Sequence, residues 1–256
     1  MDKSDTMQRY ALAVVSHLAL LLAWYLFVRF GDVPKYVMPS PEATFLSLTE
    51  GGYNWWGNVL VTGTEIFVGY FLALVVGVTL ALVFTWSKTL EQFFLPLLVS
   101  LNMIPKVALG PLIIVWFKYG IFPNSMMAFS ICVFPILLTT ARGLREIEPD
   151  LLDLVRALKG SRWQLFVKIQ LPGSLPYIFS GMKVAAILAV AGAIVGEFLG
   201  SDKGLGYLML QVQVTLDTPA MFMAVILITL IGVLLYGMVT GLEKLMVAKD
   251  ARLDRD

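Results

Sequence analysis

The longest charged passage in this strongly apolar chain is residues 149–172, PDLLDLVRALKGSRWQLFVKIQLP. Pro149 suits the first position of a helix, which has no use for the missing N–H. Asp150 and Asp153 follow in the first turn, where carboxylates suit the positive end of the helix dipole. The apolar residues then recur at the helical spacing of a single face: Leu151, Leu154, Val155 and Leu158. The pattern predicts a short amphipathic helix.

A second short helix is predicted directly after the first. Gly160 is a natural stop, and Ser161 with Gln164 has the S-x-x-Q spacing of a capping box. We expect this helix to end at Leu171-Pro172-Gly173. Two short helices joined by a tight bend, between two membrane-length segments, favour a docking surface, and an ordinary solvated loop is the alternative.

The segment resembles the EAA loop of ABC importer permease subunits, E-A-A-x-x-x-G followed by nine residues and I-x-L-P. Asp153 stands at the acidic position. Lys159 occupies the glycine position, with Gly160 one residue later, so the bend is expected at one of these two residues. The other positions of the pattern fall on Leu154, Val155, Ile169, Leu171 and Pro172.

The resemblance implies that residues 142–172 form a cytoplasmic coupling region that sits in a groove on a separate ATPase. The implied docking residues are Asp153, Leu154, Val155, Leu158, Lys159, Gly160, Ile169, Leu171 and Pro172.

Composition places the chain in a membrane. Of its 256 residues, 58% are hydrophobic and 14% are charged, whereas soluble domains average about 25% charged. The net charge of +1 argues against a nucleic-acid partner. The single cysteine, Cys132, excludes an intrachain disulfide and a thiolate metal site.

Catalytic motifs are absent from the sequence. There is no G-x-x-x-x-G-K-[ST] to cradle ATP phosphates, and neither H-E-x-x-H nor G-x-S-x-G occurs. We therefore expect a non-enzymatic subunit that binds no cofactor, with ATP and Mg²⁺ held by a partner ATPase.

Six segments have the roughly 20 apolar residues needed to cross a bilayer, which predicts one all-α domain over residues 1–256. They are residues 10–30, 63–86, 95–117, 125–141, 176–200 and 221–242. The first exceeds the length of a secretory signal core and lacks a small-x-small cleavage site, so we expect it to stay attached.

Two of these segments carry further signals. Gly69, Ala73, Gly77 and Ala81 recur every four residues and predict a ridge that another helix approaches closely. Residues 95–117 are interrupted by prolines, which predicts a kinked span or a broken helix that faces a pathway.

The distribution of Lys and Arg predicts the orientation. With a cytoplasmic N-terminus, three lysines fall in outer connections and Arg29 lies near a boundary, whereas thirteen cations fall inside. The inner thirteen are Lys3, Arg9, Lys88, Arg142, Arg145, Arg156, Lys159, Arg162, Lys168, Lys244, Lys249, Arg252 and Arg255. Both termini and the coupling region are therefore expected in the cytoplasm.

Four ionisable residues fall within the predicted spans: Glu65, Lys106, Lys183 and Glu197. A charge at this depth costs about 2.5–3.5 kcal/mol or more and normally faces a partner or a water-filled cavity. Lys106 is interpreted either as attracting an anionic substrate or as snorkelling or pairing with Glu197 or Glu65. Lys183 is expected to snorkel to the inner surface, and Trp55 and Trp56 to anchor at an interface.

Two further passages resemble the nitrate/sulfonate/taurine class of these permeases. Residues 102–112 are similar to its PKxALxPL passage, and Glu197 to Tyr207 to its E-F-L-x-x-x-x-G-L-G-Y element. We take Asn102, Lys106 and Glu197 as candidate pathway residues, with a gating or structural role favoured for Glu197.

The resemblance covers nearly the whole chain and implies the fold of a type I ABC importer permease in the plasma (inner) membrane. It implies a homodimer, two P-loop ATPase subunits, an extracytoplasmic solute-binding protein and a small anionic solute such as nitrate, a sulfonate, taurine or bicarbonate. Similar permeases carry thiamine-precursor pyrimidines.

Three alternatives remain open. A self-sufficient channel or ion-driven carrier would work without an ATPase. A membrane-embedded enzyme would need a convergent set of polar groups. A non-transporting scaffold would keep the docking loop but tolerate changes at Lys106 and Glu197.

Overall fold

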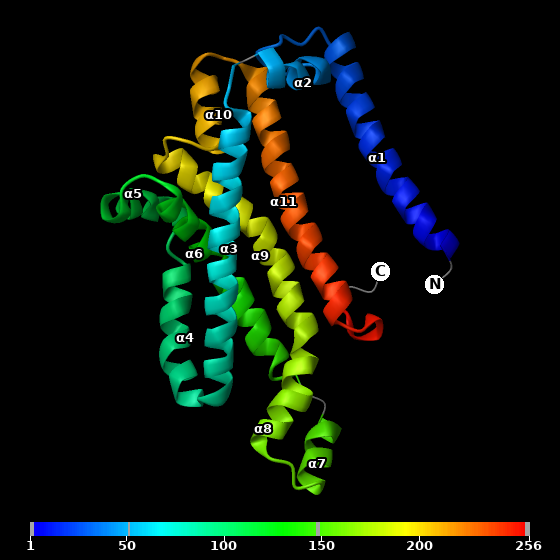
Figure 1. The fold of residues 1–256 in the computed structure, drawn as a ribbon, viewed down its shortest axis with the longest axis vertical. Helices are drawn as coiled ribbons and strands as arrows, with labels where there is room; N and C mark the ends of the chain where they lie inside the picture. Colours follow the sequence, from blue (N-terminus) through cyan, green and yellow to red (C-terminus); the bar gives the residue numbers. More distant parts are fainter. Residues whose placement is uncertain (1–2, 51, 147–148, 254–256) are drawn as a thin grey trace.

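A computed structural model describes residues 3–50, 52–146 and 149–253, and this part of the chain is helical without strands. Five helices are long and apolar enough to cross a membrane. They are α1 (Lys3–Phe30), α3 (Trp55–Trp86), α6 (Ile121–Gly143), α9 (Leu171–Gly200) and α11 (Thr218–Met246). Figure 1 shows them as an elongated bundle. The all-α membrane class is thereby confirmed.

The predicted interruption within residues 95–117 is a broken helix. The helices α4 (Lys88–Asn102) and α5 (Lys106–Phe117) meet at an angle of 89°. Counted together they are the sixth candidate span.

The second span begins earlier than residue 63. The side chain of Asn54 accepts a hydrogen bond from a backbone N–H in the first turn and starts α3 at Trp55. Trp55 is buried, and its Nε1 donates to the carbonyl of Ser47 in α2 (Pro41–Glu50) at 3.1 Å. The prediction that Trp55 anchors at an interface is therefore wrong, whereas Trp56 is exposed.

The centre of the molecule is the packing of α3, α6 and α9, and the predicted small-residue ridge makes it possible. All four ridge residues are buried. A Cβ added at Gly69 would lie 2.5 Å from the carbonyl oxygen of Ser125 in α6, so only glycine permits this approach. Helix α9 approaches α6 as closely, since a Cβ at Gly192 would lie 2.6 Å from the Cα of Ala128. The predicted ridge is confirmed.

Helix α1 lies at the edge of the bundle and joins it through the end nearest α2 (Figure 1). The Nε1 atom of Trp24 donates to the carbonyl of Pro39 at 3.0 Å, and its ring lies 5.7 Å from that of Phe222 in α11. The rest of the apolar face of α1 is exposed, as expected of a helix surrounded by lipid.

Two short helices, α7 (Pro149–Ala157) and α8 (Arg162–Leu165), occupy one end of the molecule, and α2 and α10 (Leu205–Val214) the other (Figure 1). We call these the inner and outer ends. The prediction that the second short helix stops at Leu171 is wrong, because α8 continues through a π-helical turn (Phe166–Gln170) into α9. The connection predicted as polar, residues 201–219, contains the apolar helix α10.

Candidate functional site

The bend between α7 and α8 is formed by Lys159. Its φ of +53° is left-handed, and the N–H of Gly160 donates to the carbonyl of Val155 at 2.9 Å. This is the six-to-one hydrogen bond of a Schellman motif, in which glycine is the usual left-handed residue. The bend therefore stays at the position where the EAA pattern has glycine, and Lys159 itself adopts the left-handed conformation.

The predicted capping box begins α8. The Ser161 Oγ accepts from the N–H of Gln164 at 3.2 Å, and the Gln164 Oε1 accepts from the N–H of Ser161 at 2.8 Å. Because two of the first N–H groups are satisfied in this way, the helix starts immediately after the bend. The inner helices thus have a defined geometry from local sequence alone.

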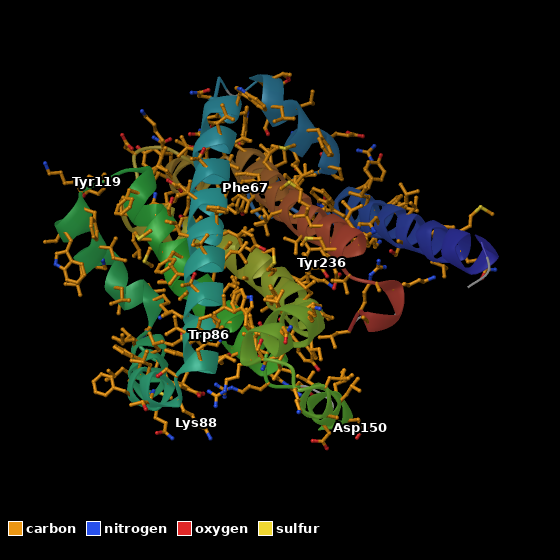
Figure 2. The ribbon with its side chains drawn as sticks, turned by 60° about the horizontal axis from the view of Figure 1, so that its bottom comes forward. Phe67, Trp86, Lys88, Tyr119, Asp150 and Tyr236 are labelled. Carbon is orange, nitrogen blue, oxygen red and sulfur yellow. The ribbon has the colours of Figure 1, made fainter. Side chains whose placement is uncertain are left out.

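Large apolar side chains project from the inner end without cover. Leu154 is 53% exposed, Leu158 73% and Trp163 61%. With Leu151 they form what we call the docking surface. Figure 2 shows Asp150, at the start of α7, at the same end of the molecule as Lys88. Exposed apolar residues beyond the ends of the membrane-length helices indicate a protein partner.

The motif residues divide into two groups. Asp153, Leu154, Leu158, Lys159, Gly160 and Pro172 are exposed, whereas Val155, Ile169 and Leu171 are partly covered. Leu171 packs against an inner core cluster that includes Phe84, Leu144 and Phe166. The first part of the motif is therefore at the surface, whereas Ile169 and Leu171 lie where the segment joins the helix bundle.

An aromatic cluster joins α8 to the inner end of α3. The ring of Trp86 lies 6.1 Å from Trp163 and 5.4 Å from Phe166, both edge-to-face, and Trp163 lies 5.8 Å from Phe166. Such pairs stabilise beyond the area they bury. Together with the continuous helix from α8 into α9, they attach the docking surface firmly to the bundle.

The candidate pathway residues do not form one site. Asn102 ends α4 and Lys106 begins α5, so both lie at the bend, where the Lys106 Nζ donates to the carbonyl of Leu101 at 3.3 Å. Glu197 instead lies at the outer end of α9, beside Glu65. The predicted pairing of Lys106 with either glutamate is therefore not what the structure contains.

Glu197 caps helix α10. Its Oε2 accepts from the N–H groups of Gly206 and Tyr207 at 2.6 and 3.1 Å, and its Oε1 accepts from the Thr62 hydroxyl at 2.5 Å. The Thr62 hydroxyl in turn accepts from the N–H of Leu205 at 2.8 Å. These contacts explain the glutamate of the E-F-L-x-x-x-x-G-L-G-Y element.

The glycine that follows in this element is required by the same geometry. Gly204 has a φ of +110°, and its N–H donates to the Asn58 side chain at 3.0 Å. A Cβ there would meet the carboxyl group of Glu197. The predicted structural role of Glu197 agrees with this geometry.

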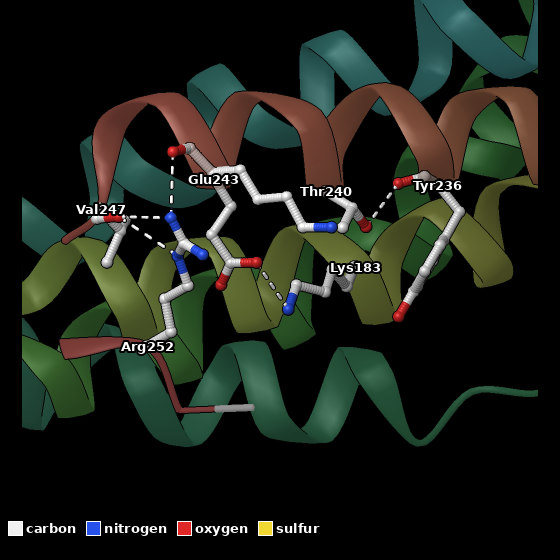
Figure 3. Close-up of polar contacts among 7 residues, drawn as sticks. Lys183, Tyr236, Thr240, Glu243, Val247 and Arg252 are labelled. Atoms are coloured by element: carbon white, nitrogen blue, oxygen red, sulfur yellow. Dashed lines mark hydrogen bonds and ion pairs between the residues drawn. The ribbon is translucent and has the colours of Figure 1, made fainter. Parts of the chain in front are cut away.

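Lys183 does not snorkel, contrary to the prediction. Its Nζ lies 2.8 Å from the Glu243 Oε2, and both side chains are more than nine-tenths buried between α9 and α11 (Figure 3). Next to this pair, the Arg252 guanidinium donates to the carbonyls of Lys244 and Val247 at the end of α11. Burial in a pair satisfies the lysine at a depth where an isolated charge would be costly.

Sequence reasoning missed the partners of these buried groups: Asn58, Thr62, Asn124 and Glu243. Glu243 carried a usable signal, because an acid at the end of an apolar span suggests a basic partner on another helix. Asn124, whose Nδ2 donates to the Glu65 Oε1 at 2.8 Å, gave none. Among the described residues, no group of three or more His, Cys, Asp or Glu could hold a metal ion.

Membrane-length helices, a broken helix and an uncovered amphipathic segment at one end are the features expected of the membrane component of a transporter. The family comparison agrees, since residues 73–247 match the model of the binding-protein-dependent transport system inner membrane component. The chain belongs to this family.

Curated relatives cover most of the chain. A probable ABC transporter permease protein of Haemophilus influenzae is 35% identical, covering 85% of this chain and 89% of its own. The riboflavin transport system permease protein RibX of Chloroflexus aurantiacus is 33% identical (93% and 89%). The formylaminopyrimidine transport permease protein ThiX of Halalkalibacterium halodurans is 30% identical (90% and 92%).

A more distant relative belongs to the anion class, and solved structures share the fold. The bicarbonate transport system permease protein CmpB of Synechococcus elongatus is 27% identical (89% and 86%). A crystal form of the MetNI methionine ABC transporter superposes with a TM-score of 0.59 over 72% of this chain and 94% of that chain, at 21% identity. The type I importer permease fold expected from the sequence is confirmed.

Proposed function

We propose that this permease subunit works in an ATP-driven importer as one of a pair, with two P-loop ATPases bound at the inner end. An extracytoplasmic binding protein delivers the solute to the outer end, and ATP and Mg²⁺ are held by the ATPases. The docking surface carries the proposal, because it presents large apolar side chains at an end where neither lipid nor the rest of the chain covers them. Helix α1 starts and α11 ends on the side that carries α7 and α8, which supports cytoplasmic termini (Figure 1).

The covalent continuity of α8, the π-helical turn and α9 supports a coupling role for residues 149–172. A movement of the docking surface is passed along one unbroken helix for 39 residues, from Arg162 to Gly200, into the centre of the bundle. Closure of the ATPases would therefore tilt α9 against α3 and α6 as a rigid element, and this opens the pathway alternately to the two faces.

The decisive experiment is co-purification in mild detergent. Tagged wild-type chain should retain a stoichiometric P-loop ATPase, and Leu158→Asp should lower retention by about 30-fold, since central apolar contacts are commonly worth about 2 kcal/mol or more. The matched control is Leu245→Asp at the inner end of α11, where the leucine is 85% exposed outside the docking surface. Equal retention by Leu158→Asp and wild type would refute the docking role, and solute transport by the chain alone in liposomes would favour the self-sufficient carrier.

For the solute we propose a small anion, supported by Lys106 at the bend of the broken helix and by the bicarbonate-permease relative. A small heterocycle is the second candidate, because the relatives named for riboflavin and formylaminopyrimidine are more similar in sequence. Uptake of labelled bicarbonate, nitrate, taurine, formylaminopyrimidine and riboflavin by cells that express the complete system distinguishes the two. Lys106→Met should reduce uptake only if the solute is an anion.

A further inference from the structure

The chain that carries the docking surface is also connected to the bundle on its N-terminal side, before α7. Arg145 follows α6 and precedes α7, and its Nη2 lies 2.5 Å from the Glu91 Oε1 in the first turn of α4. The Glu91 side chain is 15% exposed and that of Arg145 48%. The ion pair therefore joins the chain before α7 to α4, a helix that is not part of the continuous helix from α8 into α9.

Apart from this ion pair, helix α4 contacts the inner core cluster through Leu95 and Leu98, which are only partly buried. None of its fifteen residues, all of which are described, is buried. An open groove of about 420 Å³ lies beside Glu91 and Arg145 between α4 and α6, with Phe84, Leu95 and Leu137 among its apolar lining. Because side chains leave this space open and α4 buries none of its residues fully, a shift of α4 against α6 disrupts less packing than a shift among α3, α6 and α9 would.

The far end of α4 leads to the candidate pathway. The 89° bend carries Asn102 and Lys106, and α5 then packs on the outer half of α9. A Cβ at Gly110 of α5 would overlap the Leu199 side chain, so this contact is close. A displacement of α4 at Glu91 would therefore reach the bend at its opposite end.

We propose that the ion pair between Arg145 and Glu91 transmits movement of the docking segment to the broken helix α4–α5, in parallel with the direct route through α9. The inference rests on the proposed function, because the movement originates in the ATPase. Arg145 and Glu91 are positioning residues and contact neither nucleotide nor solute. The pair moves α4 because it links Arg145, just before α7, to Glu91 of α4 beside the groove between α4 and α6.

A neighbouring ion pair is the natural control. Arg142 Nε lies 3.0 Å from the Glu146 Oε2, but both residues belong to the same segment and lie four apart in sequence. Its side chains are 73% and 48% exposed, and exposed pairs of this kind contribute little. Breaking it should leave the response of α4–α5 unchanged.

The test uses the full complex with its ATPase and an environment-sensitive bimane probe. One reporter is attached at Val107→Cys in α5, where the residue is 57% exposed, and a second at Ile187→Cys in α9, which is 62% exposed. The natural Cys132 is fully buried, and the parent chain without an added cysteine measures background labelling. ATP, Mg²⁺ and vanadate are added to trap the closed ATPases, and the change in emission is recorded.

We expect both reporters to respond in otherwise unchanged chain. Arg145→Ala and Glu91→Gln should reduce the response at position 107 by more than half and leave that at 187 intact. The double reversal Arg145→Glu with Glu91→Arg should restore the response at 107, and Arg142→Ala should change neither. A response at 107 that survives Arg145→Ala, or that the double reversal does not restore, overturns the proposal.

The ATPase content of each sample separates this proposal from the proposed function. If the Arg145 and Glu91 variants retain the ATPase while the response at 107 is lost, transmission is supported. If the unchanged chain retains no ATPase, the proposed function fails, and the transmission proposal fails with it.

Discussion

Helix α10 at the outer end and helices α7 and α8 at the inner end differ in how far the chain itself supplies partners for their side chains and backbone groups. At the start of α10, at the outer end, backbone N–H groups find side-chain partners within the chain. At the inner end, α7 and α8 have well-formed caps and a fixed bend, but their apolar side chains remain uncovered. The polar groups at the start of α10 are thus satisfied within the chain, whereas the apolar side chains of α7 and α8 have no cover within it, as expected if the proposed ATPase binds there.

The beginning of α10 is capped entirely by side chains of other helices. Four successive N–H groups, from Gly204 to Tyr207, each donate to a side chain from α3 or α9. The first N–H groups of a helix have no intrahelical acceptor, so these side chains replace the water that a short exposed helix would need. The same helix end would be a weak point if Glu197 were lost.

Replacing Glu197 by alanine should therefore produce the largest effect. Two backbone N–H groups and the Thr62 hydroxyl would lose a buried acceptor, and we expect a loss of roughly 3–5 kcal/mol in the free energy of unfolding. Thermal denaturation of the detergent-solubilised chain measures it. Asp202→Ala, in the exposed connection beside α10, is the control and should change stability by less than about 0.5 kcal/mol.

At the inner end, by contrast, loss of an exposed apolar side chain should not destabilise the isolated chain. Leu158→Asp should leave the thermal midpoint unchanged, because Leu158 is 73% exposed and supports no packing within the chain. If it destabilised the isolated chain as much as Glu197→Ala does, the view of the inner end as an incomplete surface would be wrong.

Local patterns in the sequence are sufficient for the membrane class, the small-residue ridge, the first inner helix and the capping box at Ser161 that begins the second, but not for the end of that second helix. Each of these depends on residues within a few positions of one another, where helical periodicity and capping chemistry apply. The position of the bend was left between Lys159 and Gly160. The backbone hydrogen bond from Gly160 to Val155 decides it, and composition does not reveal that bond.

Contacts between distant helices could not be predicted. Lys183 pairs with Glu243, sixty residues away, and Glu197 accepts a hydrogen bond from Thr62, 135 residues away. The rule that long cations snorkel favoured the wrong outcome for Lys183, because it weighs depth and ignores an acid on a neighbouring helix. The sequence did not predict α10, because its ten residues are too few to register as a span and lie between polar residues.

A second polar contact at the outer end should have a smaller effect that depends on pH. The Tyr53 hydroxyl donates to the Asp217 Oδ2 at 2.6 Å, and this bond raises the pKa of Tyr53 to about 12. Because the pKa is raised in the folded state, the stabilisation is present in full below the ordinary tyrosine pKa of about 10 and is lost as pH rises through about 12.

Tyr53→Phe should therefore cost about 1 kcal/mol at pH 8, as expected for one hydrogen bond. The difference in midpoint between variant and wild type should shrink between about pH 10 and 12. Tyr36→Phe, which removes a hydroxyl from an exposed tyrosine on the same side, provides the reference. A difference that stays constant over this range would assign the effect to packing and not to the bond with Asp217.

The smallest expected effect lies at the inner end and acts on the backbone. Lys159 holds a left-handed conformation that costs a residue with a Cβ about 1–2 kcal/mol and costs glycine nothing. Glycine also loses more freedom on folding, by roughly 0.5–1 kcal/mol, so Lys159→Gly should give a net local gain of about 0.5–1 kcal/mol. Amide hydrogen exchange in α7 should slow by about threefold, without a change in the thermal midpoint of the bundle.

Lys159→Ala is the matched control for this variant, since it removes the same charge and keeps the Cβ. If exchange in α7 slows equally in the two variants, the charge of Lys159 and not its backbone conformation limits the stability of the bend. If it slows only with glycine, the inner end carries a strained residue at the position where the motif of related permeases has glycine. In that case the bend beside the docking surface is less stable than it would be with glycine at position 159, in contrast to the fully capped start of α10.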